Sequence, residues 1–151
     1  MSAAPPVRAP LVLAAFTPYR IVALARRMSE ELGEAYAHEG LTIPEWRVLA
    51  VIAQEPVTAA RDVTRLTPMD KMAVSRAVTS LEKRNLIVRE RSADRRVSSL
   101  RLTPAGEIVY QRVAAIALDY ENRLLHRLSP GDRRAFLDGL AALEAADRAA
   151  W

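Results

Sequence analysis

The chain has 151 residues, of which 50% are apolar, and this length suits one compact domain with its own core. Cysteine is absent, which excludes thiolate catalysis, iron–sulfur ligation, zinc fingers and cysteine redox sensing. The formal net charge is +4, and the longest apolar run near the start, residues 11–16, is too short to span a membrane, so we expect a cytoplasmic protein that contacts no membrane.

Helix starts are marked by Ser or Thr followed directly by Pro, because a side-chain oxygen can cap the helix and Pro fits its first turn. A further start is the sequence TIPE at 42–45, a capping box in which Glu45 reaches back to the amide of Thr42. The four Ser/Thr-Pro candidates are Thr17-Pro18, Thr67-Pro68, Thr103-Pro104 and Ser129-Pro130.

Apolar residues at helical spacing predict a long first helix over about residues 19–36, ended by Gly40, and a shorter second helix that stops before Pro56. Thr58 is expected to cap a brief third helix through Leu66. After a turn at 67–69, a fourth helix ends at Asn85, where a left-handed residue would close it. The buried face of this fourth helix comprises Val74, Ala77, Val78 and Leu81.

Residues 86–91 and 97–102 predict two strands around a polar, basic tip. A helix from Thr103 and a last helix after Ser129 follow. Because a two-stranded hairpin is not stable alone and must lie against helices, we expect an α+β domain that is mostly α.

The positive charge is concentrated in the middle of the chain. Residues 61–101 carry eleven basic and five acidic side chains, whereas the rest of the chain carries eleven basic and thirteen acidic ones. A basic block within a folded domain favours a polyanion as partner, although a solvated charged face is the alternative.

Several stretches resemble, in their order and spacing, the MarR family of bacterial transcription regulators over about residues 18–143. These are LTIPEWRVL at 41–49, MDKMAVSRAV at 69–78, LE at 81–82, NLI at 85–87, DRR at 94–96 and LTPAG at 102–106. Where the family commonly has Gly, this chain has Asn85. The resemblance implies a winged helix-turn-helix homodimer, with residues 41–102 as DNA-binding lobe and residues 17–40 and 103–151 as helical dimerisation region. Residues 1–16 form either a disordered arm or a segment folded over the partner subunit.

The resemblance implies that residues 70–84 form the recognition helix. Arg76 is the first candidate for a base contact, because a guanidinium can bond a guanine edge with two hydrogen bonds; the alternative is an ion pair with Asp70 or Glu82. The candidate DNA contacts on this helix are Lys71, Met72, Ser75, Arg76 and Thr79.

Residues 86–102 would form the wing. Arg95 resembles the family's minor-groove arginine, where a narrow groove concentrates negative potential. Asp94 is expected to brace the wing by a salt bridge, and Arg96 either shares in this or contacts DNA. Phosphate contacts, which position without specifying sequence, are expected from Arg89, Arg91 and Arg101.

Tyr36 and Trp46 are candidates for an effector pocket that takes a small aromatic or amphipathic molecule, although the spacing of Leu41 and Trp46 as a hydrophobic staple favours ordinary core. The two histidines, His38 and His126, are not at a metal-ligand spacing, so we expect no metal and no cofactor.

These observations together predict a sequence-specific regulator of transcription that binds double-stranded DNA. We expect a homodimeric repressor on a palindromic operator, released by a small-molecule effector. No glycine-rich phosphate loop is present, and we expect no enzyme. The alternative is a non-enzymatic helical module that binds an acidic protein or RNA through the basic segment.

Overall fold

The fold is mostly helical, with one small antiparallel sheet, and this confirms the expected fold class. It is described by a computed structural model over residues 10–54, 59–91 and 98–149. In chain order the elements are the 3-10 turn η1 (Leu13–Ala15), α1 (Thr17–Ala35), the 3-10 turn η2 (Ala37–Glu39), α2 (Ile43–Gln54), α3 (Ala60–Leu66), α4 (Lys71–Lys83), β1 (Ile87–Arg91), β2 (Ser98–Leu102), α5 (Pro104–Leu125) and α6 (Pro130–Ala149).

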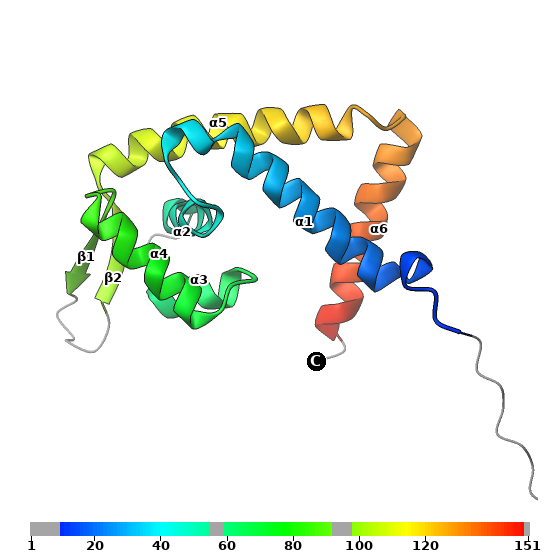
Figure 1. Cartoon of the computed structure of the whole chain (residues 1–151), viewed down its shortest axis with the longest axis horizontal. Coiled ribbons are helices and arrows are strands. Elements are labelled where there is room, and N and C mark those ends of the chain that lie inside the picture. Colours follow the sequence, from blue (N-terminus) through cyan, green and yellow to red (C-terminus); the bar gives the residue numbers. More distant parts are fainter. Residues whose placement is uncertain (1–9, 55–58, 92–97, 150–151) are drawn as a thin grey trace, which may run out of the picture.

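The elements form two regions joined by α5 (Figure 1). Helices α2, α3 and α4 and the β1–β2 hairpin gather into one lobe. Helix α5 leaves this lobe and extends to the far end of the molecule, where the chain turns into α6, and α1 runs from the region of α6 back toward the lobe. Helix α5 is therefore the element that connects the two regions.

The core lies chiefly in the lobe. Val74, Ala77, Val78 and Leu81 of α4 are buried, as the apolar spacing predicts, and they pack with residues of α2 and the hairpin in one cluster. Burial of a Val or Leu side chain contributes roughly 1.5–3 kcal/mol, so this face fixes which side of α4 is left for solvent. The largest fully buried side chains are Tyr36, Leu49, Leu81, Ile87, Leu100, Val48, Val63, Val74, Val78 and Val113.

The hairpin register puts apolar residues on one face. Ile87 pairs with Leu102 and Arg89 pairs with Leu100, and Ile87 and Leu100 are buried. Because successive strand residues face opposite sides, the register orients the hairpin against the helices.

Three of the predicted helix caps are present. The Glu45 carboxylate accepts from the Thr42 amide at 2.8 Å, the Thr103 hydroxyl accepts from the Gly106 amide at 3.0 Å, and the Ser129 hydroxyl accepts from the Asp132 amide at 3.1 Å. These contacts are local in sequence, which is why a single chain reveals them.

Two predicted capping residues are wrong, although α1 does begin at the predicted Thr17-Pro18 pair. At the first helix, Thr17 lies inside α1 and the N-cap is Phe16, without a side-chain hydrogen bond. At the fourth helix, the N-cap is Asp70, whose carboxylate accepts from the Ala73 amide at 2.7 Å. The Thr67 hydroxyl instead donates to the Val63 carbonyl at 2.6 Å, at the end of α3. Thr58 lies outside the described residues, and the N-cap of α3 is Ala59.

The corners on either side of the hairpin are held together closely. Asn85 has φ of 56°, the left-handed conformation that its predicted closing position requires. A Cβ added at Gly106 would lie 1.9 Å from the Leu86 carbonyl oxygen, so the first turn of α5 rests directly on the corner between α4 and β1. The Thr103 hydroxyl also donates to the Asn85 carbonyl at 2.7 Å.

Within residues 10–54, 59–91 and 98–149, no helix combines the length and the apolar character that crossing a membrane requires.

Candidate nucleic-acid interface

Helix α4 presents a row of exposed side chains on the face opposite its buried one. Because Val74, Ala77, Val78 and Leu81 are turned into the core, the other side of the helix is turned outward. Met72 is 63% exposed. All five candidate contacts on this helix are exposed: Lys71, Met72, Ser75, Arg76 and Thr79.

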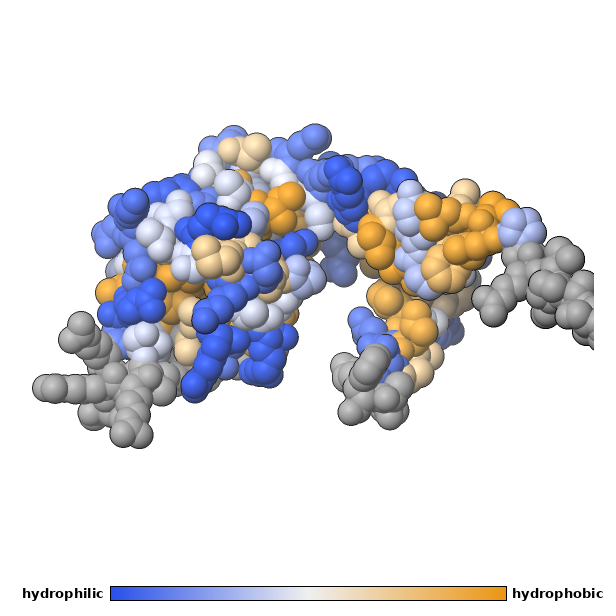
Figure 2. Space-filling view, turned by 60° about the horizontal axis from the view of Figure 1, so that its bottom comes forward, coloured by the Kyte–Doolittle hydropathy of each residue, from blue (hydrophilic) through white to orange (hydrophobic). Residues whose placement is uncertain are grey.

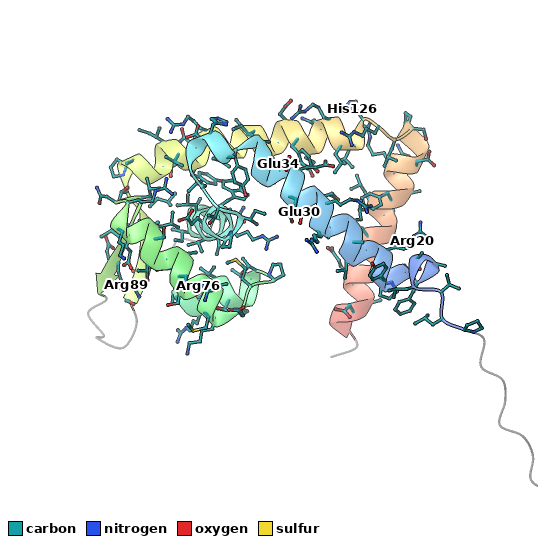
Figure 3. All side chains as sticks on the ribbon, in the orientation of Figure 1. Arg20, Glu30, Glu34, Arg76, Arg89 and His126 are labelled. Atoms are coloured by element: carbon teal, nitrogen blue, oxygen red, sulfur yellow. The ribbon has the colours of Figure 1, made fainter. Side chains whose placement is uncertain are left out.

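Arg76 makes no ion pair with any residue that the structure describes. The two acids considered as ion-pair partners of Arg76 are engaged elsewhere: Asp70 caps α4, and Glu82 pairs with Arg89. The guanidinium lies beside a groove between α4 and the start of α2, which Thr42 also lines. Arg76 is therefore available to a partner outside the chain (Figure 3).

Arg89 of β1 is already engaged within the protein. Its guanidinium donates to the Glu82 carboxylate at 3.1 and 3.3 Å and to the Ser98 hydroxyl at 3.3 Å. Arg101 likewise lies 3.1 Å from Glu90. Ion pairs this exposed stabilise by only about 0–1 kcal/mol, so a phosphate could displace the acid, but in the free protein Arg89 ties the hairpin to α4.

The remaining wing candidates are Arg91, Asp94, Arg95 and Arg96. Arg91 is the last residue of β1, and its side chain is outside the described part of the structure. Asp94, Arg95 and Arg96 lie outside the described residues altogether.

Arg61 is a candidate that the sequence reasoning missed. It lies in the first turn of α3 and, with Lys71, Ser75 and Arg89, lines a groove between α3, α4 and β1. The groove brings basic side chains from three elements to one place. Arg61 belongs to the basic block of the sequence, but no local pattern distinguishes it from the other arginines there.

Tyr36 and Trp46 lie in the core where α1, α2 and α5 meet. Tyr36 is 1% exposed, and burial raises the pKa of its hydroxyl, partly offset by the Arg47 charge. The ring centroids of Tyr36 and Trp46 are 6.0 Å apart, and Trp46 stacks on Tyr110 at 5.9 Å. An effector that touched this pair would have to enter beside that aromatic stack.

A second feature of the surface is apolar. Figure 2 shows hydrophobic residues gathered over the half of the molecule built from η1, the start of α1 and α6, away from the lobe. Helices α1 and α6 enclose a groove of about 620 Å³ there. Its large apolar lining residues include Ile21, Leu24, Phe136, Leu140 and Leu143, all more than 40% exposed.

Metal ligands do not converge in the part of the chain that is described: no group of three His, Cys, Asp or Glu side chains there could hold an ion. His126 closes α5, with its Nδ1 atom 2.6 Å from the Asn122 carbonyl oxygen.

A helix pair, α3 and α4, followed by a hairpin that packs on α4 defines a winged helix-turn-helix protein. The family model described as the MarR family matches residues 39–96, from the turn before α2 into the wing. Over these residues the chain resembles the MarR family, whose members are transcriptional regulators.

Relatives and solved structures agree with this family. The chain is 28% identical over 123 residues to an HTH-type transcriptional repressor of Mycobacterium tuberculosis, Rv2887, covering 78% of this chain and 84% of the repressor. It is 29% identical over 106 residues, 70% of the chain, to a putative transcriptional regulatory protein for the hcr operon of Thauera aromatica, of which the match spans 64%.

Among solved structures, the transcriptional repressor CouR bound to a 23-mer DNA duplex is similar with a TM-score of 0.77, 26% identity and coverage of 90% of this chain and 99% of CouR. Rv2887 in complex with p-aminosalicylic acid is similar with a TM-score of 0.73 and 25% identity, over 86% of this chain and 99% of Rv2887.

Proposed function

We propose that this regulator binds a palindromic operator in duplex DNA as a homodimer, with α4 in the major groove. The observation that carries the proposal is the exposed row on α4, where Arg76 has no ion pair among the described residues. Polar and basic side chains on a helix whose other face is buried are what base readout requires. The similarity to a repressor bound to duplex DNA supports it.

The DNA contacts fall into two kinds in this proposal. Arg76, Ser75, Met72 and Thr79 face base edges, with Arg76 the main source of sequence preference. Basic side chains around the groove between α3 and α4 and on the wing meet phosphates, which sets position and affinity. The proposed phosphate contacts are Arg61, Lys71, Arg89, Arg91 and Arg96, with Arg95 in the minor groove and Asp94 bracing the wing.

The homodimer is proposed from the apolar groove between α1 and α6. Exposed large apolar side chains gathered in one patch mark an interaction surface. A two-fold dimer joined through residues 17–40 and 103–151 would hold two copies of α4 about one helical turn of DNA apart, roughly 34–36 Å.

Release by a small molecule is proposed by likeness to Rv2887, which has been solved with p-aminosalicylic acid. Entry of an aromatic or amphipathic effector beside Tyr36 and Trp46 would act at the junction of α1, α2 and α5. An effector shifts DNA binding only by its differential affinity for the free and DNA-bound forms. The protein acts as a repressor in the cytoplasm in this proposal, with no catalytic role.

The test is a binding titration with the promoter DNA beside the protein's own gene. We expect tight binding to the duplex, falling steeply as salt rises because phosphate contacts release counterions, and weaker binding when p-aminosalicylic acid is added. Equal binding to the duplex, to single-stranded RNA of the same sequence and to polyglutamate would contradict the proposal and favour a general polyanion module.

A further inference from the structure

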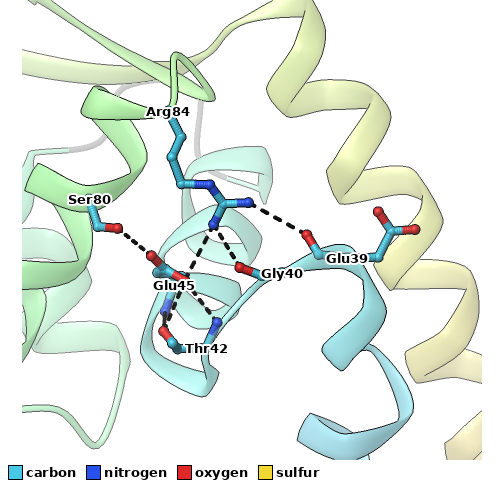
Figure 4. A network of polar contacts seen from close by, with 6 residues as sticks. All are labelled: Glu39, Gly40, Thr42, Glu45, Ser80 and Arg84. Carbon is cyan, nitrogen blue, oxygen red and sulfur yellow. Dashed lines mark hydrogen bonds and ion pairs between the residues drawn. The ribbon is translucent and has the colours of Figure 1, made fainter.

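Glu45 is the only charged side chain buried among the residues that the structure describes, with 5% exposure. One carboxylate oxygen, Oε2, accepts from the amide and the hydroxyl of Thr42 at 2.8 and 3.0 Å. The other, Oε1, accepts from the Ser80 hydroxyl at 2.6 Å. Ser80 belongs to α4, so the cap of α2 is bonded directly to the helix proposed to read DNA (Figure 4).

Arg84, at the end of α4, makes a second connection to the same place. Its guanidinium donates to the Gly40 carbonyl at 2.8 Å and to the Glu39 carbonyl at 3.5 Å, and lies 3.6 Å from the Glu45 carboxylate. These contacts hold the last turn of α4 against the turn that precedes α2 (Figure 4).

Glu39 continues the connection to α5. Its carboxylate accepts two hydrogen bonds from Arg112, at 2.9 and 2.7 Å, in the two-pronged geometry that fixes orientation as well as distance. Glu39 and Arg112 are 73 residues apart in the chain. Residues 39–45 thus contact α4 on one side and α5 on the other.

A buried carboxylate is a costly way to close a helix cap, because its desolvation must be offset by several hydrogen bonds. An exposed Glu would cap α2 equally well. What burial adds here is the bond to Ser80 and the proximity to Arg84, both on α4. The arrangement is therefore better explained if Glu45 fixes the position of α4 than if it serves to stabilise the fold.

We propose that residues 39–45 act as a clamp that sets the position of α4 relative to α5. Glu45 of α2, bonded to Ser80, and Arg84 at the end of α4 are the positioning residues for α4. Glu39 of η2, bonded to Arg112, is the positioning residue for α5. The inference rests on the proposed function, since α4 reads DNA and α5 connects the lobe to the dimer. The clamp fixes how each recognition helix meets its half-site and how far apart the two helices lie.

The contact between the clamp and α4 is tested with Ser80→Ala, which removes the hydrogen bond to Glu45. Affinity is measured for the palindromic duplex that the wild-type protein protects and for an unrelated duplex of equal length. We expect a loss of up to about tenfold on the palindrome, because without the bond to a charged group a smaller fraction of the protein has α4 in its binding position, and no loss on the unrelated duplex. Glu45→Gln should lose less than Glu45→Ala, because an amide can still accept from Thr42 and donate to Ser80.

The matched control is Ser29→Ala. The Ser29 hydroxyl is also bonded to a charged side chain of another helix, accepting from Arg47 at 3.1 Å where Ser80 donates to Glu45, but the pair joins α1 to α2 and does not touch α4. Because Ser29 also lines the groove between α1 and α6, sedimentation velocity first checks that Ser29→Ala is still a dimer. The dimeric variant should bind both duplexes like the wild type. Wild-type affinity of Ser80→Ala for the palindrome, or an equal loss on both duplexes, would overturn the clamp. If the wild-type protein prefers no palindrome, the proposed function fails and this inference fails with it.

The contact between the clamp and α5 is tested with Arg112→Gln. Binding is compared between the natural palindrome and one with a single base pair inserted between its half-sites. The wild type should lose affinity on the lengthened site, whereas Arg112→Gln should discriminate less between the two spacings. Arg123→Gln is the control, because the ion pair that Arg123 makes among the described residues runs along α5, to Asp119 at 3.1 Å. This variant should discriminate like the wild type. Equal discrimination by Arg112→Gln and the wild type would contradict the link to α5.

Discussion

At the scale of single residues, Arg76 and Arg89 illustrate two different uses of an exposed arginine. Both are charged side chains of the basic block, but Arg76 has no acid beside it in the described structure, whereas Arg89 bonds to Glu82. A guanidinium without a partner can bond a base edge at no internal cost, and one that must leave an acid cannot. Arg76 is therefore the better candidate for sequence readout.

Arg76→Ala should weaken operator binding by roughly 1–3 kcal/mol, the discrimination of one two-pronged base contact, or about five- to a hundredfold in affinity. Arg95→Ala should also weaken it, through the minor groove. Fluorescence anisotropy on a labelled operator measures both, with Arg26→Ala on α1 as control. Wild-type affinity in either variant would remove that residue from the interface.

Because of Glu45, we expect the free energy of unfolding to depend on pH in the acid range. Burial alone would raise its pKa, but hydrogen bonds from Ser80 and Thr42 and the nearby Arg84 charge outweigh burial and hold the pKa below its ordinary value of 4.5. Because the native pKa is lower than the unfolded one, the carboxylate stabilises the fold above that ordinary value, and the contribution is lost as pH falls through the native pKa.

Glu45→Gln should therefore be less stable than the wild type near neutral pH, and the gap should narrow on acidification below about pH 4. Urea unfolding of both proteins at the two pH values measures the gap. A gap that stays constant with pH would show that the charge of Glu45 contributes nothing.

At the scale of elements, the two corners beside the hairpin decide how the wing meets α4. Gly106→Ala places a methyl group against the Leu86 carbonyl. We expect destabilisation of about 2 kcal/mol or more, since backbone must move to relieve the contact. Thermal unfolding measures it. Gly131→Ala, in the first turn of α6 with its nearest neighbouring atom at 4.0 Å, is the control and should change stability by less than about 1 kcal/mol.

The sequence predicted the elements whose signals are local. The caps at Thr42, Thr103 and Ser129 and the left-handed Asn85 each depend on a few neighbouring residues. Thr67 shows the limit of such patterns, because a Thr-Pro pair also suits the end of a helix when the hydroxyl bonds backward to Val63.

Contacts between distant residues could not be predicted from the chain. The bonds from Ser80 to Glu45 and from Arg112 to Glu39 join residues 35 and 73 positions apart, and nothing in the spacing of charges distinguishes them. For the same reason the pairing of Arg89 with Glu82 and the groove that brings Arg61 to Lys71 appear only once the helices are packed.

At the scale of the whole molecule, charge and apolar surface are segregated. The basic excess lies in residues 61–101, and the apolar groove lies between α1 and α6. One end of the molecule suits phosphate and the other suits a second copy of the chain, with α5 between them.

Leu140→Glu tests the second half of this arrangement. A charge in the apolar groove should weaken the dimer by about 2 kcal/mol or more and reduce operator binding with it, because both half-sites must be held at once. Sedimentation velocity measures the dimer, with Val88→Glu, similarly exposed but on β1 in the lobe, as control. An unchanged dimer would place the interface elsewhere.

The most direct test of DNA reading by a two-fold dimer is footprinting of the purified protein on the promoter region beside its own gene. We predict one protected palindrome whose half-site centres are about 10 base pairs apart or a multiple of that, with protection lost in Arg76→Ala. Protection without two-fold symmetry would contradict the account. Binding to the promoter region that protects no particular site would contradict it as well.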